Sequence, residues 1–150
     1  MSLFTEPNVE KTAENVNKFL YRQLKWLSLQ AGVSLTSPQL SDVPIHGNGI
    51  NNTENSMERR LTALEGLKAI RYTMTQTHGL SPQLLISKYI ERKKEWQVQQ
   101  DIHISHNIYP KYKELALCEF ANAWVITWDK FGFDEEDRIE LRIFDTKKSL

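Results

Sequence analysis

The chain has 150 residues, long enough for one domain with a substantial core, and its 40% hydrophobic and 25% charged content is typical of a soluble globular protein. Its 19 basic and 19 acidic residues give a net charge of zero, which argues against a protein that coats nucleic acid non-specifically. No apolar run approaches the roughly 20 residues of a membrane-spanning helix, so we expect no membrane partner.

Two features of the sequence indicate the cellular compartment: the first 15 residues and the single cysteine. The N-terminus lacks the basic start and apolar core of a secretory signal. One cysteine, Cys118, cannot form an internal disulfide. We therefore expect a cytoplasmic protein, with Cys118 as a buried or half-buried apolar residue of a helix.

The apolar pattern predicts a first helix over residues 9–31. Val16, Phe19, Leu20 and Leu24 recur at three- and four-residue steps, and Ala31-Gly32 is a plausible stop. Residues 33–56 are instead rich in serine, proline, glycine and asparagine, which is typical of a linker. We therefore expect residues 1–32 to form an N-terminal helix for dimerisation or partner contact, on a flexible linker over 33–56.

A helical domain is predicted for residues 57–124. Asn55 or Ser56 can cap a helix that runs to about Gln76 and is followed by Gly79. Ser81-Pro82 then has the features of a helix start, and that helix reaches about Lys93. The fold class that follows is mainly α, a helical bundle.

The stretch from Trp96 to Trp124 predicts two more helices separated by a tight turn. Val98 and Ile102 share one face of a short helix, and Ile104-Ser105 falls at the turn. The inner stripe of a longer helix follows; its residues are Tyr109, Tyr112, Ala116, Phe120 and Trp124. Such a pair, over about residues 95–124, is what a helix-turn-helix needs to place side chains in the major groove of DNA.

Local charge is compatible with that interpretation. Between Lys88 and Lys113 there are six positively charged and three negatively charged residues. Residues 125–150 form a C-terminal extension of uncertain structure, with an acidic run at 134–137. Within it, Arg138 to Phe144 alternates enough for a strand but also allows a short helix.

The order and spacing of these elements resemble region four of bacterial sigma factors and, more closely, the ArpU family of phage late-gene and autolysin transcriptional regulators. The resemblance is carried by Tyr89, Trp96, Ile104-Ser105, Tyr109 and the run from Ala116 to Ala121. The N-terminal half is similar too, in the opening MSLF, the helix NVNKFLYRQLKWLSLQAG, the SLTSPQLSDVP segment, the Gly-Asn patch and the MERRLTALEGLKAI helix. The resemblance covers roughly residues 1–124.

This resemblance implies a transcriptional regulator that binds double-stranded promoter DNA, activates late genes and contacts host RNA polymerase. It implies that the turn and the start of the second helix face DNA, which here are Ser105, His106, Asn107, Ile108 and Lys111. The residues expected to contact the DNA backbone, and so to position the protein on the duplex, are Lys93, Lys94 and Gln97. A homodimer is the default expectation, because one helix-turn-helix covers only a half-site.

Two positions depart from the family pattern. The turn position that is commonly glycine is His103, which tolerates a positive φ better than most residues. Pro110 would cost about 3 kcal/mol deep inside a helix but is tolerated in the first turn. We therefore predict a recognition helix that starts at about Ile108.

Other chemistry finds little support in the sequence. His103 and His106 lack further ligands for a metal, and Cys118 lacks a local signature of a nucleophile. Glu135, Glu136 and Asp137 are more typical of a solvated face than of catalytic carboxylates. We expect no enzyme activity, metal or cofactor.

A second function stays open: a helical interaction protein, such as a phage packaging or assembly adaptor. The surface around Ser105–Lys111 discriminates between the two. A continuous basic face favours DNA, whereas an exposed apolar face with Trp96 and Ile108 outward favours a protein partner.

Overall fold

The computed structural model describes residues 4–40 and 54–145, and within these ranges the protein is mainly helical and contains no β-strand. The helices are α1 (Val9–Ala31), α2 (Glu54–Thr75), α3 (Ser81–Leu85), α4 (Glu95–Ile102) and α5 (Tyr109–Lys130). Shorter helical turns are η1 (Pro38–Leu40), η2 (Ile86–Ile90) and η3 (Glu135–Asp137). None of the described helices is both long and apolar enough to cross a membrane.

Local signals in the sequence set the ends of α1 where they were predicted. The Asn8 side chain accepts a hydrogen bond from the Lys11 backbone N–H at 2.9 Å and caps the first turn. Gly32 adopts the left-handed conformation with φ 67° and ends the helix. The predicted helix over 9–31 is confirmed.

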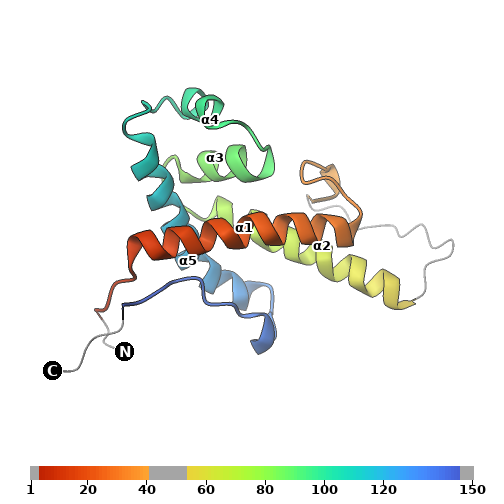
Figure 1. The fold of residues 1–150 in the computed structure, drawn as a ribbon. Coiled ribbons are helices and arrows are strands. Elements are labelled where there is room, and N and C mark those ends of the chain that lie inside the picture. Colours follow the sequence, from red (N-terminus) through yellow and green to blue (C-terminus); the bar gives the residue numbers. More distant parts are fainter. Residues whose placement is uncertain (1–3, 41–53, 146–150) are drawn as a thin grey trace.

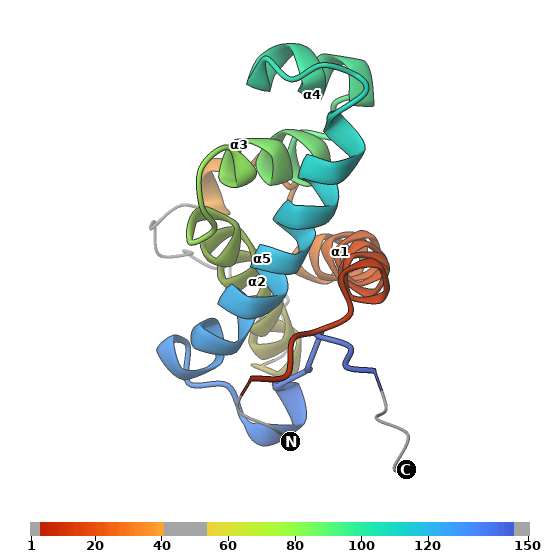
Figure 2. The same ribbon diagram turned by 90° about the vertical axis from the view of Figure 1, so that its left-hand side faces the viewer.

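The core lies where α1, α2 and α5 pack against one another. Figures 1 and 2 show α1 crossing α5, with α3 and α4 stacked at one end of this arrangement and α4 outermost. Aromatic rings fill the α1–α5 contact: Phe19 lies 5.4 Å from Trp124 and 6.5 Å from Phe120 between ring centroids. The described part of the chain therefore places α4 and the start of α5 at an accessible end.

The N-terminal helix belongs to this same core. Val16, Leu20 and Leu24 of α1 are buried among residues of α2 and α5. Leu35 and Leu40, inside the segment expected to be a linker, are buried too. The expected break after residue 32 is wrong for residues 33–40, because these leucines pack into the core. Residues 41–53 of the expected linker, including the Gly-Asn patch, lie outside the described residues.

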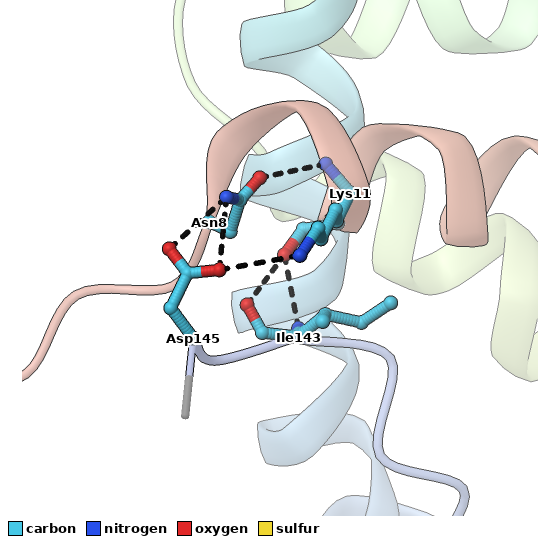
Figure 3. A network of polar contacts seen from close by, with 5 residues as sticks. Asn8, Lys11, Ile143 and Asp145 are labelled. Atoms are coloured by element: carbon cyan, nitrogen blue, oxygen red, sulfur yellow. Dashed lines mark hydrogen bonds and ion pairs between the residues drawn. The ribbon is translucent and has the colours of Figure 1, made fainter. Parts of the chain in front are cut away.

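Residues 138–145, here named the C-terminal strap, return to the first turns of α1 (Figure 3). The Asn8 backbone N–H donates to the Ile143 carbonyl at 2.7 Å, and the Ile143 N–H donates to Thr12 Oγ1 at 3.0 Å. Asp145 accepts two hydrogen bonds of 3.1 Å from the Asn8 side chain. The expected strand or short helix over 138–144 is wrong, because polar groups of α1 satisfy the strap's backbone in place of a second strand.

Leu141 anchors the strap, and its replacement tests that contact. Its side chain is 2% exposed in the core. We expect Leu141→Ala to lower the free energy of unfolding by about 2–4 kcal/mol, because it leaves a cavity beneath α1. Urea denaturation measures this loss, and Ile139→Ala in the same strap, at an exposed position, should cost less than about 0.5 kcal/mol. Equal losses in the two variants would contradict the anchoring role.

Candidate nucleic-acid interface

The turn after α4 is closed by a histidine in a conformation that usually selects glycine. His103 has φ 57° and ψ 43°. Its N–H donates to the Gln100 carbonyl at 3.2 Å, and the Ile104 N–H donates to Gln99 at 3.1 Å. These bonds satisfy the last carbonyls of α4, so the chain turns without a glycine, as the sequence predicted.

The second helix of the pair starts at a residue that places Pro110 where a proline destabilises a helix least. The Ser105 carbonyl accepts hydrogen bonds from the N–H groups of Ile108 and Tyr109, at 3.1 and 3.0 Å. α5 begins at Tyr109, so Pro110 falls in its first turn, where a missing N–H removes no intrahelical bond. Tyr109 is 3% exposed and fixes this end of α5 to the protein. The predicted late start of the helix is confirmed to within one residue.

The five residues expected to face DNA are brought together at the exposed end of the molecule. Ser105, His106, Asn107, Ile108 and Lys111 are all exposed. They follow the outermost helix α4 and lead into α5 (Figure 2). Among the described residues Lys111 has no ion-pair partner, so its charge is available. We name residues 103–111 the tip.

Two of the three residues expected to position the DNA backbone are otherwise engaged. Lys93 lies 2.7 Å from an oxygen of Asp101 and 3.8 Å from one of Glu91, and the Asp101 hydrogen bond raises its pKa. Gln97 Oε1 accepts the Lys94 backbone N–H at 3.0 Å and so caps α4. Lys94 alone is exposed with no ion-pair partner among the described residues.

Glu95 neutralises two further cations below the tip. Its Oε1 lies 2.8 Å from Lys88 Nζ and 3.3 Å from Lys113 Nζ. Burial alone would raise the pKa of Glu95, but the hydrogen bond from Lys88, the nearby Tyr109 hydroxyl and the charges of Lys113 and Lys88 lower it to about 2. Of the six cations between Lys88 and Lys113, three therefore have no ion-pair partner among the described residues: Arg92, Lys94 and Lys111.

The pKa of Glu95 gives a pH prediction. Since it falls from 4.5 to about 2 on folding, the ion pairs stabilise the protein above about pH 4.5 and lose that effect as the pH falls towards 2. We expect the free energy of unfolding at pH 7, measured by urea denaturation, to be higher in wild type than in Glu95→Gln by less than about 1 kcal/mol, because the pairs are part-exposed. The difference should close by pH 2; a gap independent of pH would contradict the assignment. Glu58→Gln, at an exposed position, serves as the control.

Apolar side chains also reach the surface beside the tip. Ile108 is 52% exposed and Leu115 56% exposed, with Tyr112 between them on α5. Together with Val9 of α1 they line an apolar groove of about 290 Å³. Trp96 of α4 is 56% exposed. The face is thus neither continuously basic nor wholly apolar.

Two larger hollows flank the tip, and the sequence did not reveal either. The first, named the α4 hollow, has a volume of about 480 Å³ and is lined by Trp96, Gln99, Gln100, His103, Ile104 and Ser105. The second, named the α1 hollow, has a volume of about 450 Å³ and includes Glu10, Glu14, Glu95 and Glu114 in its lining. The α1 hollow could not be predicted because its lining combines residues of α1 with residues of α4 and α5 that are far away in the sequence.

The residues weighed for other chemistry are placed as follows. Cys118 is half-buried, its Sγ lies 3.4 Å from the Val9 carbonyl, and burial raises the pKa of its thiol to about 11, which disfavours the reactive thiolate. His103 and His106 are both exposed. Within the described residues, the one group of three side chains able to hold a metal is Asp134, Glu136 and Asp137, all exposed.

Comparison of the chain with protein-family models, with curated proteins and with solved structures gave no match. A function must therefore be inferred from the chain's own residues.

Proposed function

We propose that this protein is a transcriptional regulator of a phage or prophage that binds promoter-region duplex DNA through α4, the tip and α5. The observation that carries the proposal is the helix–turn–helix itself. A short helix and a long helix are joined by a tight turn, and the turn and the first residues of α5 are exposed at one end of the molecule. The resemblance to the ArpU family supports activation of late genes as the biological role.

The chemistry of the tip fits contacts to a duplex. Lys111, free of ion pairs among the described residues, can neutralise a phosphate or reach a guanine, and the Ser105 hydroxyl can donate to a phosphate oxygen. The Asn107 amide suits the donor–acceptor pair of adenine, and His106 can donate to a base acceptor. Lys94, at the start of α4, suits the neighbouring backbone.

Two partners belong to the proposal. In a homodimer, the second helix-turn-helix would bind the DNA half-site that the first one leaves unread. Contact with host RNA polymerase is implied by the family resemblance. Each of these two partner assignments is separate from DNA binding, and either can be wrong while the protein still binds DNA.

A titration tests the proposal. Purified protein is added to fragments from the late promoter region of the phage or prophage that encodes it, at several salt concentrations, beside unrelated DNA and the Lys111→Ala variant. We expect saturable binding that prefers one fragment and weakens in the variant. Absence of binding to every fragment at low salt, where phosphate contacts are strongest, would overturn the proposal.

A second candidate function is favoured by the apolar groove of Val9, Ile108, Tyr112 and Leu115. Exposed apolar side chains at adjacent helical positions are typical of a protein contact, as in a packaging or assembly adaptor. The titration separates the two functions. An adaptor should bind no duplex, and its assembly role should fail in Leu115→Asp but survive in Lys94→Ala, which changes an exposed residue outside the groove.

A further inference from the structure

The α1 hollow is an acidic cavity that DNA binding does not explain. Two of its walls are formed by residues within 10–17 of α1 and within 110–117 of α5, and Glu95 of α4 contributes a third side (Figure 2). In both helices the lining residues recur at three- and four-residue steps, so they lie on one face of each helix. Three helices therefore direct side chains into one volume of about 450 Å³.

The charge inside this hollow is negative and only partly neutralised. Four carboxylates line it, those of Glu10, Glu14, Glu95 and Glu114. The Lys113 ammonium lies 3.3 Å from Glu95, and Lys18 lies 3.3 Å from Glu14. Glu10 and Glu114 have no ion-pair partner among the described residues. These two carboxylates attract a cation and repel the phosphates of DNA.

A buried hydroxyl in the same lining indicates a ligand independently of the charges. Tyr109 lines the hollow and is 3% exposed. Its hydroxyl lies near enough to Glu95 to lower the pKa of that carboxyl, but no group of the described residues meets it at hydrogen-bonding distance and angle. Buried hydroxyls in proteins nearly always have a hydrogen-bond partner, so the Tyr109 oxygen is free to accept an N–H from a bound group.

The remaining lining favours a cation that is carried on an aliphatic stem. Ala13 and Leu117 are 6% and 3% exposed, and Pro110 adds its ring. Apolar groups of this kind pack against methylenes while a charged head reaches the carboxylates. A guanidinium suits these acceptors better than an ammonium, because its five planar N–H groups can serve two carboxylates and a hydroxyl together, and it is less strongly hydrated.

We infer that the α1 hollow binds the guanidinium group of an arginine side chain that a partner protein presents. The guanidinium donates to Glu10, Glu114 and the Tyr109 oxygen, and its methylene stem packs against Leu117. A free arginine fits less well, because its own carboxylate would be repelled by Glu14, whose side chain is 69% exposed at the rim. The inference goes beyond the proposed function and does not depend on it, since no contact involves DNA.

The test uses N-acetyl-arginine methylamide as the probe and the full chain as the receptor. It is run by NMR at about 20 mM salt, where attraction between exposed charges is weakly screened. We expect saturable shifts of the backbone amides of Ala13, Asn17 and Leu117, with a Kd on the order of 1 mM, as a ligand this small allows. The citrulline analogue has the same shape without the charge and should bind at least about tenfold more weakly.

Two further probes identify the source of the cation. Free arginine represents an amino-acid ligand, and spermidine represents a polyamine. Both should bind more weakly than N-acetyl-arginine methylamide. Tighter binding of either one would show that the hollow serves a small molecule and would contradict the assignment to a partner protein.

Variants locate the binding site. We expect Glu114→Gln to weaken binding of the probe about fivefold, and Glu10→Gln combined with it to weaken binding more than about tenfold. Tyr109→Phe should weaken binding about threefold and hardly change thermal stability, because the hydroxyl has no hydrogen bond to lose. Glu58→Gln is the control, since it removes the same charge at an exposed position of α2 outside the hollow. Thermal unfolding checks that each variant is folded.

Three results would overturn the inference: no saturable shift of the lining amides at about 50 mM probe, where a millimolar site is filled; equal binding of the citrulline analogue; or equal losses in Glu58→Gln and Glu114→Gln. Each of them leaves the DNA titration unaffected. Failure of this inference is therefore distinct from failure of the proposed function.

Discussion

Phe120→Ala should lower the free energy of unfolding by about 3–5 kcal/mol, the largest effect on stability that we expect from a single substitution. Phe120 is fully buried, at 0% exposure, where α5 crosses α1. Its ring stacks on Trp124 at 5.8 Å and 17° between planes, and it lies 6.5 Å from Phe19. Truncation would remove both aromatic contacts and leave a cavity between α1 and α5.

Urea denaturation at neutral pH measures this loss. The matched control is Leu115→Ala, on the same helix but 56% exposed, which should cost less than about 0.5 kcal/mol. A loss below about 1 kcal/mol in Phe120→Ala would contradict the packing of α5 against α1 described above.

Lys111→Glu should weaken binding to duplex DNA about 50-fold at 50 mM salt. Lys111 is exposed at the tip with no ion pair among the described residues, so its charge is not already neutralised. Its loss removes one phosphate contact, and the glutamate adds repulsion in the same place. Stability should hardly change, because the side chain is not buried.

The affinity is measured by fluorescence anisotropy of a labelled duplex, and Lys25→Glu is the control. Lys25 is an exposed cation of α1 that also lacks an ion pair among the described residues. Its reversal should cost less than about threefold, since it lies outside the tip. Equal losses in the two variants would indicate non-specific attraction to the whole surface instead of binding at the tip.

The elements that local rules govern could be predicted from the sequence. The bounds of α1 follow from Asn8 as the N-cap and Gly32 as the left-handed stop. His103 at positive φ and Pro110 in the first turn of α5 follow from the backbone preferences of single residues. Each signal acts over a few residues, so no knowledge of the tertiary structure was needed.

The elements that depend on distant partners could not be predicted. The C-terminal strap alternates like a strand, but its backbone is hydrogen-bonded to Asn8, Thr12 and Asn15 of the distant N-terminal region. Leu35 and Leu40 lie among polar residues, and only the assembled core shows that they are buried. The apolar alternation of the strap and the polar composition of residues 33–40 therefore led to the wrong prediction for both segments.

The candidate site could be predicted only in part, because the exposure of its residues is set locally whereas their ion pairs depend on residues farther along the chain. Exposure of Ser105–Ile108 and Lys111 follows from the position of the turn. The pairing of Lys93 with Asp101 and of Lys113 with Glu95 depends on side chains 8 and 18 residues away. A count of charges predicts an excess of three cations between Lys88 and Lys113, but only the geometry identifies the three that are unpaired among the described residues: Arg92, Lys94 and Lys111.

The most direct test of DNA binding at the tip is to map backbone amide shifts by NMR as a 30-bp duplex is added, since a chain of 17.5 kDa is well suited to the method. We predict that the largest shifts fall between Lys94 and Lys111, with small shifts in α2 and in the C-terminal strap. If the duplex moves no amide at low salt, or moves chiefly those of α2, the tip is not a DNA-binding surface.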